Sequence, residues 1–496
     1  MTSELEVGLY IFMLAGFLGY HLITRVPPLL HTPLMSATNA IAAISLVGSL
    51  VVAGADYTNV RFGWVCATLG FLAVTCSTTN AVGGFLITDR MLSMFRTSKD
   101  QRAGAAQQRN SHVLLIIGTI AVAFLIGWII WWKKENAGHV GVHAQALRYS
   151  YIVSAVMFIL GLKGLSSPRW ARRGMQLAAC GMLLAVLGTL LDEKIVNFTL
   201  IIIGFVIGTV VGGGMGLQIP MTAVPQRTAL SHSLGALAAC LVGIAEFVRY
   251  EEMSAVRLTA LDFQVIVGAL TFTGSLIAAA KLQELLPGRP ITYKGQNLLS
   301  LATFGIIAVI GVYLVFVQRP SPLFYLMVFL AMGFGLLLVI PIGAADMPTV
   351  IALLNSYGGL ADASMGFVLM NKIQIITGSL DGTSGFLLAL LMCRAMNRSA
   401  LNVLFGAFGR VASEDEAAKA AAAKGTVRSI SHEETAVLFE NASSVIIVPG
   451  YGMAVAQAQH AVAELAGILK EQGVDVKYAI HPVAGRMPGH MNVLLA

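Results

Sequence analysis

The stretch Ser444-Val-Ile-Ile-Val-Pro-Gly-Tyr-Gly-Met-Ala-Val-Ala-Gln-Ala-Gln459 has the order of a strand, a glycine turn and a helix. Its β-branched apolar run favours a strand over residues 445–448, and the Ala- and Gln-rich end favours a helix. Between them, Gly450 permits a tight turn and Gly452 lets the backbone approach a pyrophosphate, as in dinucleotide-binding folds. Val455 stands where such motifs carry Gly or Ala, so an ordinary βαβ turn is the alternative interpretation.

A second strand is predicted over residues 474–480 and completes one βαβ unit. It leads into His481-Pro-Val-Ala-Gly-Arg-Met-Pro-Gly-His490, where Gly485 allows close backbone approach and Arg486 offers a forked cation to phosphate. We therefore predict a Rossmann-like α/β nucleotide-binding domain over residues 441–496. One βαβ unit is a small sheet, so we expect this domain to be truncated or completed by residues beyond Ala496.

The composition indicates a polytopic α-helical membrane protein. Hydrophobic residues make up 56% of the chain and charged residues 11%, against roughly 25% charged in soluble domains. A span needs about 20 apolar residues. Thirteen candidate spans are predicted, at residues 7–24, 38–55, 63–87, 112–132, 149–165, 174–191, 199–217, 228–248, 262–282, 298–317, 323–343, 349–371 and 373–394.

Basic loops set the expected orientation, because Lys and Arg concentrate on the cytoplasmic side. With thirteen alternating spans, the basic loops 88–111, 166–173 and 281–297 share one side with the C-terminal domain, which we expect to be cytoplasmic. The bases near Lys133 and Arg249 lie on the other side, against the rule. Membrane-edge charges account for the net charge of +7, so no nucleic-acid partner is expected. The five cysteines have no metal-ligand spacing and are interpreted as core residues.

A linker is expected at residues 399–440, because its acidic run and Ala/Lys tract are polar and low in complexity. Within it, Ser431-x-x-Glu434 predicts a capping box that begins a short helix.

Polar residues inside predicted spans are functional candidates, because they are costly in a bilayer. His232 is suited to pass protons in the eighth span, and a structural histidine bonded to backbone is the alternative. Asn355 lies one to two turns into the twelfth span, where it can hold water or bond across helices. Asp346 is expected to close the eleventh span. Asp362 and Asp381 lie deeper, in the twelfth and thirteenth spans, and together these groups suggest a proton path.

The chain resembles the proton-translocating nicotinamide nucleotide transhydrogenases. The motifs that carry this resemblance are residues 449–459 and 481–496, Ala345-Asp-Met-Pro348, Leu354-Asn-Ser-Tyr357 and Met392-Cys-Arg-Ala-Met-Asn-Arg398. Residues from about 148 onward resemble the β subunit, and residues 8–96 resemble the membrane end of the α subunit. The resemblance implies α-like membrane helices at 1–111, a linking helix and loop at 112–147, and a β-like proton channel at 148–398.

Several site roles are implied by the resemblance alone. It implies that His232 and Asn355 belong to the proton path and that Asp346 couples the membrane part to the nucleotide domain. It implies NADP(H) bound by this chain and NAD(H) on a partner α-type subunit, in a Re/Si-specific enzyme. It further implies a homodimer of protomers in the bacterial inner membrane. The implied NADP(H) contacts are Gly450, Tyr451, Gly452, Met453, Ala454, Val455, Val483, Ala484, Gly485, Arg486, Met487 and Pro488.

The resemblance also has departures. Asp362 and Asp381 stand where mostly uncharged residues are expected, and the basic residues expected to read a 2′-phosphate are absent from the sequence. Two alternative functions stay open: a dinucleotide-gated transporter or channel without hydride transfer, and a purely structural membrane subunit. The second leaves the glycine turn and Arg486 without a purpose.

Overall fold

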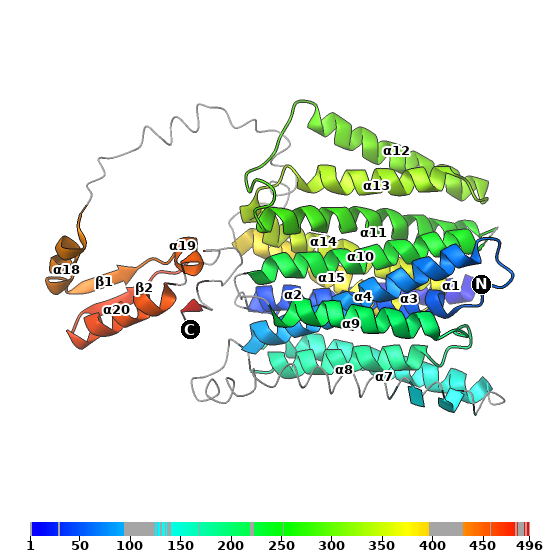
Figure 1. The fold of residues 1–496 in the computed structure, drawn as a ribbon, viewed down its shortest axis with the longest axis horizontal. Helices are drawn as coiled ribbons and strands as arrows, with labels where there is room; N and C mark the ends of the chain where they lie inside the picture. Colours follow the sequence, from blue (N-terminus) through cyan, green and yellow to red (C-terminus); the bar gives the residue numbers. More distant parts are fainter. Residues whose placement is uncertain are drawn as a thin grey trace.

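The computed structural model describes residues 2–27, 30–93, 125, 127–128, 131–133, 135, 140–167, 169–218, 223–250, 252–395, 430–456, 458–481, 484, 491 and 494–495. A bundle of long helices forms the membrane part, and a small α/β unit follows it (Figure 1). The helices of the bundle are α1 (Thr2–Ile23), α2 (His31–Ala42), α3 (Ser45–Gly54), α4 (Gly63–Ser93), α7 (Val140–Gly164), α8 (Ala171–Thr189), α9 (Thr199–Leu217), α10 (Val224–Arg249), α11 (Ala255–Leu282), α12 (Gln296–Val317), α13 (Leu323–Val339), α14 (Met347–Leu369) and α15 (Lys372–Ala395).

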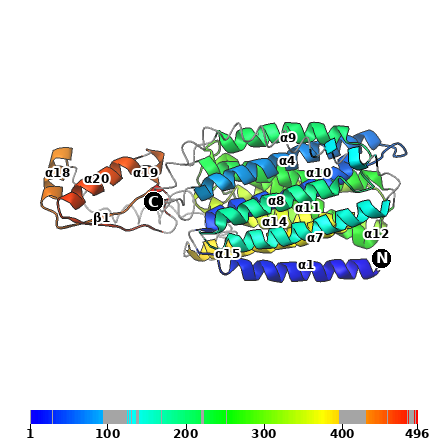
Figure 2. The same ribbon diagram turned by 90° about the horizontal axis from the view of Figure 1, so that it is seen from below.

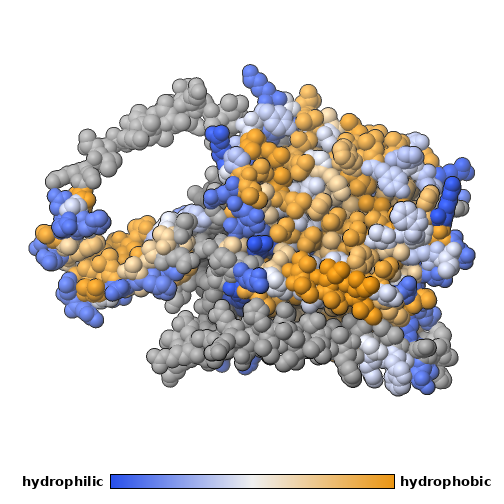
Figure 3. Space-filling view, in the orientation of Figure 1, coloured by the Kyte–Doolittle hydropathy of each residue, from blue (hydrophilic) through white to orange (hydrophobic). Residues whose placement is uncertain are grey.

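Twelve of the thirteen predicted spans coincide with these helices, α2 and α3 together making up the second span. Nine spans in the described part of the chain are long and apolar enough to cross a membrane, while α8, α13 and α14 are shorter or more polar. Most of the fourth predicted span, 112–132, lies outside the described residues, so the count of thirteen stays a prediction. Apolar side chains cover the visible flank of the bundle and hydrophilic ones gather at its ends (Figure 3), as expected of a multi-pass membrane protein.

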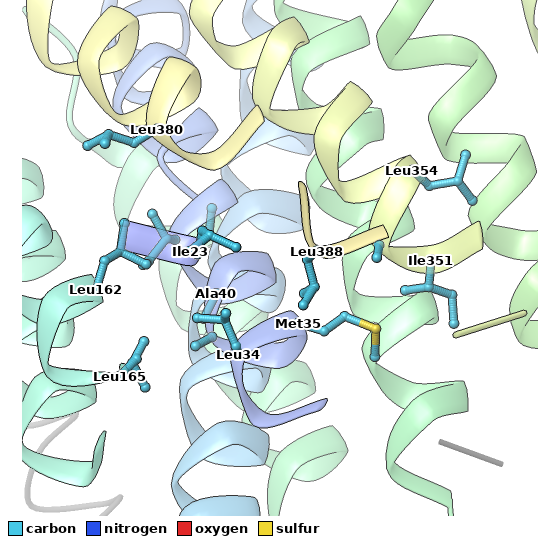
Figure 4. Packing of buried hydrophobic residues seen from close by; sticks show 14 of the residues in the cluster. Ile23, Leu34, Met35, Ala40, Leu162, Leu165, Ile351, Leu354, Leu380 and Leu388 are labelled. Carbon is cyan, nitrogen blue, oxygen red and sulfur yellow. The ribbon is translucent and has the colours of Figure 1, made fainter. Parts of the chain in front are cut away.

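The second predicted span begins seven residues earlier than expected and is broken. Helix α2 starts at His31, and a turn at Ala43 and Ile44 separates it from α3. Every residue of both helices is buried. Figure 4 shows Met35 of α2 among side chains of α14 and α15, between Ile351 and Leu388. Because α2 faces protein on all sides, its polar first turns do not require an apolar sequence.

Asp346 was placed wrongly by the sequence. Helix α13 ends at Val339, and Asp346 lies in the 3-10 helix η3 (Ala344–Asp346), where it is the N-cap residue of α14. It therefore precedes the twelfth span instead of closing the eleventh.

The C-terminal unit contains α18 (His432–Glu440), β1 (Ser444–Ile447), α19 (Tyr451–Val455), α20 (Gln459–Glu471) and β2 (Asp475–Tyr478). Figure 2 shows it as a separate layer beyond the bundle. The two strands pair in parallel from Ser444↔Asp475 to Ile447↔Tyr478, as the βαβ pattern predicted. The single helix expected between them is instead two, because the chain turns between α19 and α20.

The predicted capping box is present at the start of α18. The Ser431 hydroxyl accepts from the Glu434 amide at 3.2 Å, and the Glu434 carboxylate accepts from the Ser431 amide at 3.0 Å. Most of the predicted linker 399–440 lies outside the described residues; its final part, 430–440, contains this capped helix.

Candidate functional site

Helices α14 and α15 approach to backbone contact because glycines line their interface. A Cβ atom built on Gly359 would lie 2.8 Å from the Cα of Gly382, and one on Gly378 would lie 2.6 Å from the carbonyl oxygen of Gly359. Real Cβ atoms do not come this close, so only glycine fits at these positions. The small residues around Asp381 therefore have a packing role, as the alternative interpretation held.

The close approach brings Asn355 of α14 to Asp381 of α15. The Asn355 Nδ2 atom lies 3.2 Å from Oδ1 and 3.4 Å from Oδ2 of Asp381, and it lies 3.1 Å from the hydroxyl of Thr38 on α2. All three side chains are buried. The Asn355 Oδ1 atom has no hydrogen-bond partner among the described residues. Asn355 thus joins three helices and keeps one buried acceptor unused.

His232 of α10 faces the same helix. Its Nδ1 lies 3.0 Å from the hydroxyl of Ser275 on α11, and its ring is 1% exposed. A Cβ atom on Gly358 of α14 would lie 2.7 Å from Nε2. That nitrogen has no partner in the described part of the protein. The imidazole is therefore bonded to a side chain, unlike the structural histidine bonded to backbone, and its second nitrogen points at α14 within a turn of Asn355.

Further hydroxyl and amide groups lie beside the histidine. Asn80 of α4 accepts a 2.6 Å bond from Ser231, the residue before His232, and its Nδ2 donates to the Asn39 carbonyl oxygen at 3.3 Å. Sequence reasoning missed Asn80, Ser231, Ser275 and Thr38, because Ser, Thr and Asn are common in membrane helices. Their spacing from His232 and Asn355 along the chain gave no signal of contact.

Asp346 and Lys281 lie at the end of the bundle where α14 begins. Lys281 is 1% exposed and donates to the carbonyl oxygens of Ile340 and Ile342, the latter at 2.7 Å. These carbonyls follow α13, where a cation stabilises the negative end of a helix. Asp346 lies nine residues before Asn355, a rise of roughly 13 Å along a helix.

The glycine turn lies in the separate C-terminal unit, away from the histidine and asparagine. Gly450 is extended (φ −117°, ψ 178°) and is the N-cap residue of α19, directly after β1. Cβ atoms on Gly450 or Gly452 would meet nothing within 4 Å. Of the other predicted contacts, Ala484 is described, whereas Val483 and residues 485–488 lie outside the described residues. The open approach to Gly450 and Gly452 fits a ligand whose phosphates come close to backbone.

No group of His, Cys, Asp and Glu that could hold a metal ion occurs among the described residues. What the bundle does bury is a histidine, aspartates and an amide among hydroxyl groups, in helices that span a membrane. These features define a polytopic membrane protein equipped for proton transfer.

Comparison with known proteins identifies the family. Residues 147–496 match the family model for the NAD(P) transhydrogenase beta subunit, and residues 8–97 match that for the 4TM region of pyridine nucleotide transhydrogenase. The chain belongs to the NAD(P) transhydrogenase beta subunit family. It is a membrane subunit of a proton-translocating NAD(P) transhydrogenase, so the resemblance and the enzyme class predicted from the motifs are confirmed, and the gated transporter is not favoured.

Two relatives match different segments of the chain. The chain is 46% identical over 357 residues to the NAD(P) transhydrogenase subunit beta of Rhodospirillum rubrum, covering 70% of this chain and 76% of that protein. It is 40% identical over 95 residues to the second portion of the divided subunit alpha of the NAD(P) transhydrogenase from the same organism, covering 19% of this chain and 65% of that protein.

Proposed function

We propose that protons cross the membrane beside α14 and that this movement drives hydride transfer from NADH to NADP⁺. The observation that carries the proposal is the arrangement of polar groups on this one helix. Asn355 bonds to Asp381 on one side, and Gly358, less than a turn away, admits the Nε2 atom of His232 from the other. Protonation changes the charge of His232 and its donor capacity, so it changes what α14 packs against.

Asp346 is the proposed link between this proton site and the nucleotide domain. It sits at the start of α14, so a small shift of that helix moves it directly. Coupling requires that proton occupancy near His232 and Asn355 favour one state of the nucleotide domain over another, because a ligand shifts an equilibrium only through differential affinity.

The nucleotide bound by this chain is proposed to be NADP(H), held at the turn from Gly450 to Val455 and by residues 483–488. The absence of packing around Gly450 and Gly452 supports this, because nothing within the described chain requires glycine there. When bound, the nicotinamide ring supplies the hydride chemistry. The chain's own residues position it: backbone N–H groups at the turn face the phosphates, and Arg486 is proposed to pair with them.

We further propose the complete arrangement. Thirteen spans place a Rossmann-like domain at 441–496 in the cytoplasm, behind the linker at 399–440. Residues 1–111 and 148–398 are the α-like and β-like membrane parts, joined by 112–147. An α-type subunit of Re/Si specificity brings NAD(H), and protomers pair in a bacterial inner membrane. The match of residues 8–97 and 147–496 to two different family models supports these boundaries.

The test uses the full chain with an NAD(H)-binding α-type subunit in sealed vesicles. Reduction of an NADP⁺ analogue by NADH is followed with and without an imposed proton gradient. We expect the gradient to accelerate the reaction and His232→Ala to abolish that acceleration. Normal gradient-driven turnover in His232→Ala would contradict the assignment of His232, and nucleotide binding without hydride transfer would contradict the proposed reaction.

A further inference from the structure

Two aspartates face each other where α14 and α15 are closest. Asp362 of α14 and Asp381 of α15 are 2% and 1% exposed. A Cβ atom on Gly359 would lie 2.9 Å from Oδ2 of Asp381, so this carboxyl group rests on the α14 backbone. Asp362 follows Gly359 by three residues and lies on the same face, almost one turn further on. The two carboxyl groups are close enough to interact electrostatically.

The pair has no cation to balance two negative charges. The ion pairs between described residues involve Asp89, Glu246 and Asp475, and neither Asp362 nor Asp381 takes part in one of them. Two neighbouring carboxylates in a medium of low dielectric constant cannot both remain ionised. The pair therefore holds at least one proton.

A second observation points to a proton at this place. Asn355 gives its Nδ2 group to Asp381, while its own Oδ1 is buried without a partner among the described residues. The Nε2 atom of His232 is likewise buried without a partner, against the residue next to Gly359. Buried polar atoms are normally paired, so two unused ones beside a carboxylic acid mark where an O–H group or a bridging water is missing.

We propose that Asp362 and Asp381 form a proton-sharing carboxyl pair, a second proton-binding site on the path that passes His232 and Asn355. The proposal rests on the proposed function and adds a site that the resemblance does not assign. With one proton on the pair, the ionised carboxylate accepts a charge-assisted bond from Asn355. Arrival of a second proton neutralises the pair and weakens that bond, and its departure to the other side restores it. Only O–H bonds form and break, and nothing is oxidised or reduced.

Other titratable groups on the packed elements leave the pair the nearest proton store to Asn355. Lys281 is engaged by carbonyl oxygens at the end of α11. Tyr151 of α7 bonds to Thr189 and receives a bond from Asn371. The titratable groups on α14, α15 and the elements packed against them, besides the pair itself, are Glu4, Glu6, Tyr10, Tyr20 and His21 on α1, His31 on α2, His143, Arg148, Tyr149, Tyr151 and Lys163 on α7, Arg227, His232, Cys240, Glu246 and Arg249 on α10, Arg257, Asp262 and Lys281 on α11, Asp346 on η3, Tyr357 on α14, and Lys372, Cys393 and Arg394 on α15.

The variants Asp381→Asn, Asp362→Asn and the double variant test the proposal in the vesicle assay. Asp262→Asn is the matched control, because Asp262 is also a buried aspartate but lies on α11. We expect gradient-stimulated NADP⁺ reduction to fall at least tenfold in Asp381→Asn and the double variant, with a changed pH profile. Binding of NADPH should stay within twofold of wild type, and Asp262→Asn should retain the wild-type profile.

Infrared spectroscopy of the wild-type protein tests the pair without relying on a folded variant. We expect a carboxylic-acid carbonyl stretch at neutral pH that shifts in D₂O, persists in Asp262→Asn and Asp381→Glu, and disappears in the double variant. Its absence from wild type would overturn the proposal. So would a double variant with the wild-type rate and pH profile, or a rate that follows sodium concentration instead of pH. If wild type shows no gradient stimulation, the proposed function fails, while the infrared band still decides whether the pair holds a proton.

Discussion

Replacing Gly358 by alanine puts a methyl group against the imidazole of His232. The new Cβ would lie 2.7 Å from Nε2, whereas ordinary contact begins at 3.4 Å, so the difference of 0.7 Å must be made up by movement. The ring cannot retreat directly, because its Nδ1 is already 3.0 Å from the hydroxyl of Ser275. It must therefore rotate, and Nδ1 leaves Ser275.

The expected loss follows from that bond. A buried neutral hydrogen bond contributes about 1 kcal/mol, which corresponds to about a fivefold change in rate if His232 carries protons. The stability of the fold should change much less, because alanine favours a helix over glycine by about 1 kcal/mol and the obstructing atom belongs to a side chain that can turn. We therefore expect Gly358→Ala to lower coupled turnover at least fivefold with little change in melting temperature.

The measurement is gradient-driven NADP⁺ reduction in vesicles, alongside thermal unfolding in detergent. Gly305→Ala on α12 is the control, since a Cβ there meets nothing within 4 Å and should leave turnover unchanged. Ser275→Ala should reproduce most of the loss by removing the same bond. Wild-type turnover in Gly358→Ala would refute the argument that the ring must keep its present position.

Three further predictions concern other regions of the chain. Gly450→Ala should weaken NADPH binding at least tenfold, whereas Gly467→Ala, equally open in this structure, should not; equal affinities would remove the turn from the nucleotide site. Glu246→Ala leaves Arg257 without its 2.9 Å partner and should destabilise the bundle by about 3 kcal/mol, seen as a lower melting temperature; an unchanged value would mean that water replaces the carboxylate. Ser431→Ala should weaken α18 by about 1 kcal/mol and speed amide exchange at its first turn, and unchanged exchange would argue against the capping box.

The sequence predicted helices best where they face lipid. Such helices need a continuous apolar surface about 20 residues long, which hydropathy detects. It failed at the start of α2, where His31 and the following polar residues were left out of the second span. That helix is covered by protein on every side, so packing and hydrogen bonds replaced the hydropathy signal.

For the site, residue type was informative and position was not. His232 and Asn355 were predicted as candidates because polar groups inside a bilayer are costly. Their partners come from distant segments: Thr38 lies 317 residues before Asn355, and Ser275 lies 43 residues after His232. Glycines such as Gly358 determine these contacts, yet each is only one of 51 in the chain.

The basic residues on the unexpected side of the membrane have structural reasons to be there. Lys133 donates to the carbonyl oxygens of Asp192 and Ile195, at 2.6 Å and 2.9 Å, after the end of α8. Helix ends leave carbonyl groups without partners, and a cation satisfies them. Arg257 is held by Glu246, which is 1% exposed and would be costly to bury without a counter-charge. Since packing at that end of the bundle requires these cations, they do not weigh against an orientation that places the basic loops and the nucleotide domain in the cytoplasm.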